Sequence, residues 1–252
     1  MQSFDLCYRA VVAYDGTRYQ GWQLQGHTQE TIVGALTASF FKTFHRECTI
    51  LGASRTDAGV HAVGQVIRLK TDCSIEPARL LKALNAHLPH DIRFRSCDRA
   101  PVGFHPLQGV VNKRYYYHVA QQPTLPFVSR YVYSPYVSYD RDRLYAALQV
   151  FVGEHDFRSF CTGDEQESTV RRVRSIRIER IPRYGIDRIV VDGPSFLRHM
   201  IRRMVGAALI VAASPRRHPD ELRAALAAKN PETTLATAPP HGLLLRRVWY
   251  DQ

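Results

Sequence analysis

The sequence has few cysteines and none of the spacings that hold a metal ion. Its five cysteines are an odd number, widely separated and without a Cys-x-x-Cys pair. Neither a disulfide framework nor a zinc site is therefore expected, and reduced, buried thiols are the simpler interpretation. The eleven histidines show no H-x-E or H-E-x-x-H spacing. We expect a protein that uses no metal and no other cofactor.

Long apolar runs and negative charge are also scarce. No stretch approaches the roughly 18 to 20 apolar residues that span a bilayer. The first ten residues, MQSFDLCYRA, resemble neither a secretion signal nor a transit peptide, so we expect a cytoplasmic protein. Lys and Arg number 34 against 23 Asp and Glu, which gives a net charge of +11. This balance favours an anionic partner, either nucleic acid or an acidic membrane surface.

Hydrophobic periodicity predicts an α+β chain in which one order of elements occurs twice. With 45% apolar residues among 252, the chain can bury one large core or two small ones. The first half has predicted strands at residues 6–14, 49–53, 63–69 and 91–97, and predicted helices at 31–44, behind Thr28 as a cap, and at 77–88. The second half has predicted strands at residues 114–119, 173–181, 186–191 and 243–250, and predicted helices at 141–152, 195–213 and 219–228.

This repetition indicates two ferredoxin-like halves of the β-α-β-β-α-β type that RRM domains also have. We predict residues 1–106 as the N-terminal half and residues 107–252 as the C-terminal half. Two such halves would place a cleft where their sheets meet, and substrate pockets favour such junctions.

One loop carries the strongest chemical signal. Residues 52–62 read GASRTDAGVHA and set Arg55, Thr56 and Asp57 in a tight connection between two predicted strands. A plain hairpin would use Asp57 to cap the turn and Gly59 to supply a positive φ. Loops on a rigid scaffold are also where catalytic groups tend to lie, and eleven residues of this composition are far more specific than Asp-x-Gly.

The loop resembles the active-site loop of the TruA family of tRNA pseudouridine synthases, whose core reads G-R-T-D-A-G-V-H. Further segments match the family in order along nearly the whole chain. They are YDGTRYQGWQ (14–23), RYYY (114–117), GEHDF (153–157) with SF (159–160), FLRHMIRRMVG (196–206), and AP (238–239) with GL (242–243).

Two departures from the family pattern concern the backbone and the RNA contacts. Ser54 stands where the family usually has Gly, so a positive φ at that position is less favourable. Residues 104–108, FHPLQ, align with F-H-A-R-F and lack its Arg. Neither departure removes a residue of the chemistry.

The resemblance implies a pseudouridine synthase fold, no cofactor, and isomerisation of uridine to pseudouridine at positions 38, 39 and 40 of the tRNA anticodon arm. It also implies a homodimer. The reaction breaks the C1′–N1 bond, rotates the uracil and closes a C5–C1′ bond. An ionised carboxylate can start it by attacking the sugar or the base, or by removing a sugar proton. Asp57 is the candidate for that role.

A carboxylate in a site that excludes water needs a nearby cation to stay ionised. By family match this cation is Arg202. On a helix from Ser195, Arg202 and Arg198 would lie one turn apart on a basic face that also holds His199 and Arg203.

The remaining assignments follow from the resemblance. Tyr115 is expected to stack on the target uracil and to help move its C5 proton, with Tyr115 and Tyr117 on one side of their strand. Arg55 resembles the family's base-flipping arginine, and Leu243 is expected to contact the substrate. The expected RNA contacts are Arg55, Phe104, His105, Arg114, Arg198 and Arg203.

Two other classes of protein share some of these features. A non-catalytic RRM-like RNA-binding protein also combines ferredoxin-like halves, aromatic residues and positive charge, but the RNP1 pattern is absent. A zinc-dependent base-modifying hydrolase would need His-x-Glu and Cys-x-x-Cys spacings, which are also absent. We therefore favour the synthase.

Overall fold

The computed structural model describes residues 6–26, 28–163 and 168–251. The chain is an α+β protein, as predicted, and its contacts divide it into two compact units. Unit 1 contains Met1–Val111 together with Leu245–Gln252, and unit 2 contains Asn112–Leu244. The C-terminal residues thus belong with unit 1, although the predicted C-terminal half extended from residue 107 to residue 252.

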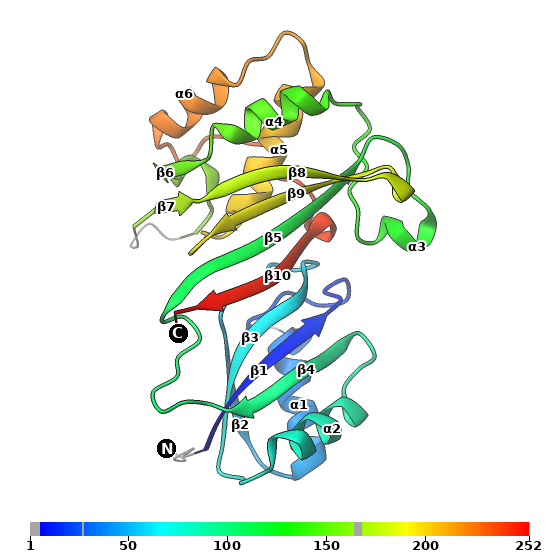
Figure 1. Cartoon of the computed structure of the whole chain (residues 1–252), viewed down its shortest axis with the longest axis vertical. Coiled ribbons are helices and arrows are strands. Elements are labelled where there is room, and N and C mark those ends of the chain that lie inside the picture. Colours follow the sequence, from blue (N-terminus) through cyan, green and yellow to red (C-terminus); the bar gives the residue numbers. More distant parts are fainter. Residues whose placement is uncertain (1–5, 27, 164–167, 252) are drawn as a thin grey trace. The chain divides into compact units, whose positions relative to one another are not determined.

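Unit 1 is an antiparallel sheet with two helices packed together on one face (Figure 1). Its strand order is β4-β1-β3, and both β2 and β10 lie beside β3. The elements are β1 (Leu6–Tyr14), α1 (Ile32–Phe44), β2 (Cys48–Gly52), β3 (His61–Thr71), α2 (Pro77–His87), β4 (Ile92–Arg99) and most of β10 (Leu243–Tyr250).

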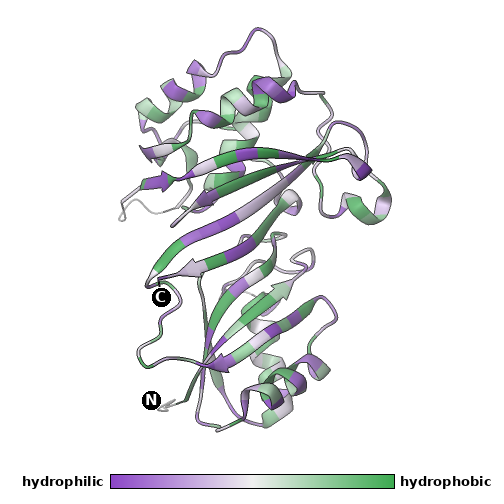
Figure 2. Cartoon of the chain, in the orientation of Figure 1, coloured by the Kyte–Doolittle hydropathy of each residue, from purple (hydrophilic) through white to green (hydrophobic). Residues whose placement is uncertain are grey.

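Alternation of side chains explains how this sheet forms its core. Along β4, Ile92 and Phe94 are buried whereas Arg93 and Arg95 are exposed, and the same bands are visible in Figure 2. Successive residues of a strand point to opposite faces, so this pattern buries one face only.

The helix starts in unit 1 follow local capping rules. The Thr31 hydroxyl accepts a hydrogen bond of 3.1 Å from the Gly34 N–H, which makes Thr31 the N-cap of α1. Thr28 as the predicted cap was wrong, because its hydroxyl accepts from the Glu30 N–H before the helix begins. Pro77 opens α2, as expected for a residue that lacks an N–H to donate.

Unit 2 has three antiparallel strands in the order β5-β9-β8, with α4 and α5 packed against each other and α6 nearby (Figure 1). A separate two-stranded sheet pairs β6 with β7. The elements are β5 (Val110–Ala120), α3 (Pro126–Ser129), α4 (Arg141–Gln149), β6 (Gly153–Asp156), β7 (Val170–Val173), β8 (Ser175–Ile181), β9 (Ile186–Gly193), α5 (Met200–Ala213) and α6 (Asp220–Ala228).

Two predictions in unit 2 were wrong. The predicted strand at residues 173–181 is divided at Arg174, whose N–H donates to the Asp192 carbonyl, so β7 pairs with β6 and β8 pairs with β9. The predicted helix at residues 195–213 begins only at Met200, because His199 has a φ of 60°. Arg198 therefore lies before the helix and not one helical turn from Arg202.

The cysteines differ in environment. All five are reduced thiols, and Cys48 and Cys97 are buried, which raises the pKa of each to about 12. The expectation of buried thiols was wrong for the other three, which are only half-buried: Cys7, Cys73 and Cys161. No helix in the described ranges is long and apolar enough to cross a membrane.

Candidate active site

The predicted loop between β2 and β3 is confirmed and spans residues 53–60. Its first residue continues the β ladder, since the Ala53 N–H donates to the Val66 carbonyl over 2.8 Å. A turn closes it, with the Val60 N–H donating to the Asp57 carbonyl over 3.1 Å and Gly59 at a φ of 76°. Asp57 is half-buried in this turn, and Arg55 is exposed.

The N-terminal motif at residues 14–23 packs directly against this loop. The hydroxyl groups of Tyr14 and Thr56 share a buried hydrogen bond of 2.8 Å. The Trp22 N–H donates to the Thr56 carbonyl over 3.0 Å. Gly21 has a φ of 95°, and a Cβ there would lie 2.9 Å from the same carbonyl oxygen. Two motifs recognised separately in the sequence thus form one structure around the residue before Asp57.

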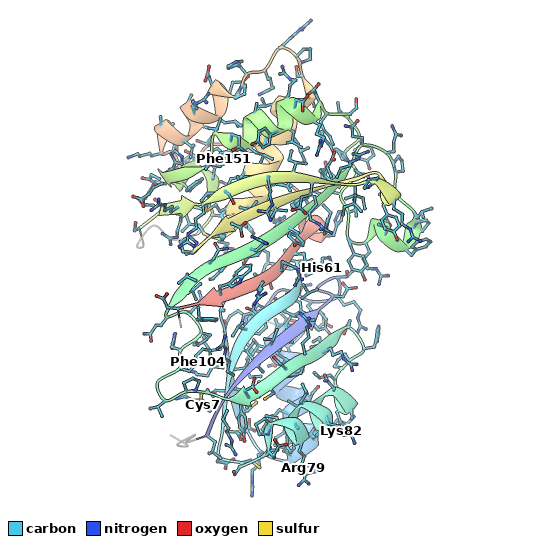
Figure 3. The ribbon with its side chains drawn as sticks, in the orientation of Figure 1. Cys7, His61, Arg79, Lys82, Phe104 and Phe151 are labelled. Atoms are coloured by element: carbon cyan, nitrogen blue, oxygen red, sulfur yellow. The ribbon has the colours of Figure 1, made fainter. Side chains whose placement is uncertain are left out.

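His61 ties the far end of the loop to the turn after β1. It is the first residue of β3, is labelled in Figure 3, and is only 3% exposed. Its Nδ1 accepts a hydrogen bond of 3.1 Å from the Gly16 N–H and lies 3.1 Å from the Asp15 Oδ1. A Cβ on Gly16 would clash with the Val60 carbonyl. The turn and the loop therefore require glycine at this contact.

Asp91, just before β4, holds the motif at residues 14–23 through two hydrogen bonds. Its carboxylate accepts from the Arg18 Nε over 2.8 Å and from the Tyr19 hydroxyl over 2.7 Å. Burial, followed by the hydrogen bond to Asp91, raises the pKa of Tyr19 to about 12. Tyr19 is thus a neutral hydrogen-bond donor at physiological pH.

In unit 2, the predicted alternation of tyrosines along β5 is confirmed. Tyr115 and Tyr117 are buried on one side, whereas Arg114 and Tyr116 are only half-buried. The Tyr115 ring packs edge-on against Phe196, with 5.4 Å between ring centres.

Arg202 lies in the first turn of α5 and contacts the C-terminal segment before β10. Its Nε donates to the Ala238 carbonyl over 2.8 Å, and the Ala238 N–H donates to the Arg202 carbonyl over 3.0 Å. Tyr117 holds the same segment through a hydrogen bond of 2.9 Å to the Pro239 carbonyl. Leu243 follows it and is buried. Within unit 2, Arg202 and Tyr117 therefore both hold the segment that leads to Leu243.

The predicted RNA-binding arginines have different surroundings. Arg198 is exposed. Arg203 is half-buried, and its Nη1 donates to the Ser159 and Cys161 carbonyls over 3.3 and 3.0 Å. The end of the motif at residues 153–160 and the residue that follows it thus provide two carbonyl acceptors for Arg203 of α5.

Arg114 forms a two-point ion pair with Asp192, at 2.9 and 3.1 Å. Burial alone would raise the pKa of Asp192, but hydrogen bonds from Arg114, Asn112 and Arg177 outweigh it and hold that pKa below its usual value. Asp192, in β9, is therefore an ionised carboxylate that links β9 to both β5 and β8.

Phe104 and His105 lie in the loop between β4 and β5 (Figure 3 labels Phe104). The Phe104 ring packs edge-on against Tyr250, and the Arg9 guanidinium lies 5.5 and 4.9 Å from the centres of these two rings. The His105 Nδ1 accepts from the Leu107 N–H over 3.3 Å. Both residues are half-buried and anchor their own loop.

Comparison with known proteins decides the family. The sequence model of the tRNA pseudouridine synthase family matches residues 10–106 and 147–251. The chain belongs to the tRNA pseudouridine synthase family. This confirms the resemblance found in the motifs and makes the chain an isomerase that acts on tRNA.

Individual synthases match over almost their full length. The chain is 35% identical over 244 residues to tRNA pseudouridine synthase A of Pseudothermotoga lettingae, covering 96% of this chain and 98% of the relative. It is 38% identical over 246 residues to tRNA pseudouridine synthase A of Exiguobacterium sibiricum, covering 97% of each.

The synthase family match includes the Asp57 loop and α5 but not residues 107–146. The assignment of Tyr115 therefore depends on the Arg-Tyr-x-Tyr motif and on its position in β5. Sequence reasoning missed the supporting residues His61, Gln65 and Asp91. Gln65 could have been noticed as a polar residue next to the apolar residues Val66 and Ile67, but nothing local indicates its partner. In the part of the chain that the structure describes, no three His, Cys, Asp or Glu side chains group as metal ligands would.

Proposed function

We propose that this synthase isomerises uridines 38, 39 and 40 in the anticodon arm of tRNA, with Asp57 as the reacting carboxylate. The observation that carries this proposal is how the loop is fastened. Residues on both sides of Asp57 are held by hydrogen bonds, from Trp22 to Thr56 and from Gly59 to Tyr19, while Asp57 itself is only half-buried. A fixed backbone next to a carboxylate residue that is not fully buried suits attack on a bound nucleotide.

The reaction needs one group to start it and a closed site to finish it. The Asp57 carboxylate attacks the sugar or the base, or removes a sugar proton, and the C1′–N1 bond breaks. The detached uracil turns within the site, the C5–C1′ bond forms as any bond to Asp57 breaks, C5 loses its proton, and N1 gains one. Because the uracil is not covalently held to the sugar during this turn, water must be excluded.

Arg202 is the proposed charge partner that keeps Asp57 ionised. Its Nε donates to the Ala238 carbonyl, which fixes the plane of the guanidinium. Its backbone is fixed by the return hydrogen bond from Ala238. A cation placed this rigidly loses little conformational freedom when it meets a carboxylate.

The other roles complete the proposal. Tyr115 stacks on the uracil and assists transfer of the C5 proton, Leu243 contacts the substrate, and Arg55 enters the RNA stack when the base is flipped. Arg55 is exposed in the loop, as that role requires. We also propose a cytoplasmic homodimer that contacts RNA through Arg55, Phe104, His105, Arg114, Arg198 and Arg203.

The test uses tRNA transcribed with uridine that carries tritium at C5, because pseudouridine formation releases this label to water. The wild-type chain should release it, and Asp57→Asn should not, with tRNA affinity unchanged within a few-fold. Asp98→Asn, at an exposed position of β4, is the matched control and should behave as wild type.

Mapping pseudouridine in the product tRNA tests the positions. Turnover by clean Asp57→Asn would refute the catalytic assignment. Tight binding of tRNA by the wild type with no release of tritium would favour the RRM-like alternative.

A further inference from the structure

Gln65 is a buried polar side chain in β3 for which the reaction outlined above has no use. It is 0% exposed. Its Oε1 accepts from the Ser54 N–H over 3.2 Å, and its Nε2 donates to the Ser54 carbonyl over 2.6 Å. One amide side chain therefore satisfies both backbone polar groups of Ser54.

This contact begins where the β ladder ends. The strand pairing of β2 with β3 runs to Gly52, and the last backbone bond is the one from the Ala53 N–H to the Val66 carbonyl. Beyond it the chain leaves β3 to form the loop. Buried backbone groups require partners, and the Gln65 amide supplies for Ser54 the pair of bonds that a strand would supply.

The position of Ser54 gives this contact its significance. The Gln65 amide holds Ser54 on one side of Arg55, and Tyr14 and Trp22 hold Thr56 on the other. Asp57 comes next in the chain. Ser54 is not among the described residues with a positive φ. The serine that replaces the family's glycine therefore fits this pair of hydrogen bonds to Gln65, here called the clamp, without backbone strain.

We propose that Gln65 is a positioning residue that fixes the backbone carrying Arg55 and Asp57. The effect of Gln65 on catalysis rests on the proposed function, because Gln65 acts only through Arg55 and Asp57. Displacement of a catalytic group by about 1 Å can lower a rate about 100-fold. Loss of the clamp should therefore lower kcat and leave KM for tRNA nearly unchanged.

Two substitutions separate positioning from mere space filling. Gln65→Met fills the volume without either hydrogen bond, and we expect kcat to fall about 100-fold. Gln65→Glu has nearly the shape of the amide. When protonated, its carboxyl group can accept from the Ser54 N–H and donate to the Ser54 carbonyl. When ionised, it places a negative oxygen against that carbonyl.

The activity of Gln65→Glu relative to wild type should therefore rise as the pH falls, whereas the ratio for Gln65→Met should stay flat. The titratable and charged groups on the strands and loop around Gln65 include Tyr14, Arg55, Asp57 and His61, and also Arg246 and Arg247 on the neighbouring strand β10. They are the same in every variant, so ratios taken at each pH cancel their contribution.

Hydrogen exchange provides a readout that does not need activity. In Gln65→Met, amides at residues 53–60 should exchange at least several-fold faster, with no change in β9. The control is Gln149→Met in α4, whose Nε2 donates to the Ile176 carbonyl over 2.9 Å. This variant should alter neither exchange in the loop nor release of tritium.

Wild-type kcat in Gln65→Met, or the same pH dependence in both variants, would overturn the proposal. Faster exchange throughout unit 1 with a lower melting temperature would also overturn it, since Gln65 would then only stabilise the fold. If the wild type releases no tritium, the proposed function fails, and the exchange in the loop alone supports or refutes the clamp.

Discussion

The loop at residues 53–60 and the basic segment at residues 196–203 were both predicted to carry function, but the structure holds them in different ways. In the loop, backbone groups are fastened by Tyr14, Trp22 and Gln65, so Arg55 remains exposed. In the basic segment, side chains themselves form the attachments, since Arg202 and Arg203 both donate to backbone carbonyls. Arginines that look alike in the sequence therefore differ in whether their side chains are exposed to RNA or bonded within the protein.

The largest expected effect comes from removing the charge of Arg202. Arg202→Met removes the proposed charge partner of Asp57, so turnover at neutral pH should fall about 100-fold or more. The activity that remains should require higher pH. Arg202→Lys should lose less, because it keeps the charge but not the guanidinium geometry.

The measurement is a pH-rate profile with saturating tRNA. An unmoved acidic limb and near-normal turnover in Arg202→Met would show that another cation has this role, and Arg198 would be tested next.

A moderate effect is expected from the contact between the two motifs. Tyr14→Phe leaves the buried Thr56 hydroxyl without its 2.8 Å partner, at a cost of about 1 to 3 kcal/mol in unfolding free energy. Adding Thr56→Val should cost less than the sum of the single changes, because the same bond is lost once.

Urea unfolding measures these costs, and release of tritium measures activity, which should fall with them. Tyr250→Phe is the control, since its hydroxyl donates to the Pro106 carbonyl outside the loop. Tyr250→Phe should lose stability and keep its turnover. Equal losses of turnover in Tyr14→Phe and Tyr250→Phe would contradict the prediction that the Tyr14–Thr56 hydrogen bond supports activity.

Within the basic segment, the exposed Arg198 can be compared with Arg203, whose side chain bonds to backbone carbonyls. Arg198→Met should weaken tRNA binding several-fold and reduce its salt dependence, because an exposed cation can meet phosphates. Arg203→Met should in addition lower the unfolding free energy by about 1 to 3 kcal/mol, because two carbonyls lose their donor. Binding titrations at two salt concentrations and urea unfolding distinguish these outcomes. If Arg203→Met alone flattened the salt dependence, Arg203 would be the phosphate contact.

The smallest expected effect concerns acid stability in unit 2. Because Asp192 has a lowered pKa in the folded state, its ionisation stabilises the fold above the unfolded pKa of about 3.9. That contribution is lost as the pH falls through the folded pKa. Asp192→Asn should be less stable than wild type at pH 7, with a smaller difference near pH 3. Urea unfolding at both pH values is the test, and a pH-independent difference would contradict it.

The sequence predicted correctly those helices and strands whose ends depend on residues close by in the chain. The strands at residues 6–14 and 243–250 were predicted with their observed bounds, and the start of the helix at 31–44 within one residue. Alternation and turn chemistry act over a few residues, so one sequence is enough to recognise them. The helix at 195–213 was predicted five residues too early, because its apolar periodicity gives no sign that His199 takes a left-handed conformation.

The sequence by itself determined the α+β class through its periodicity, and it determined the synthase family and the candidate carboxylate through the resemblance of its ordered motifs to known synthases. Only the tertiary structure decided which groups support that carboxylate. Tyr14 and Thr56 are 42 residues apart, and Arg203 reaches carbonyls 42 and 44 residues before it. Hydrogen-bond partners at such separations are chosen by packing, because any polar side chain can bond to any backbone group that the fold places within reach.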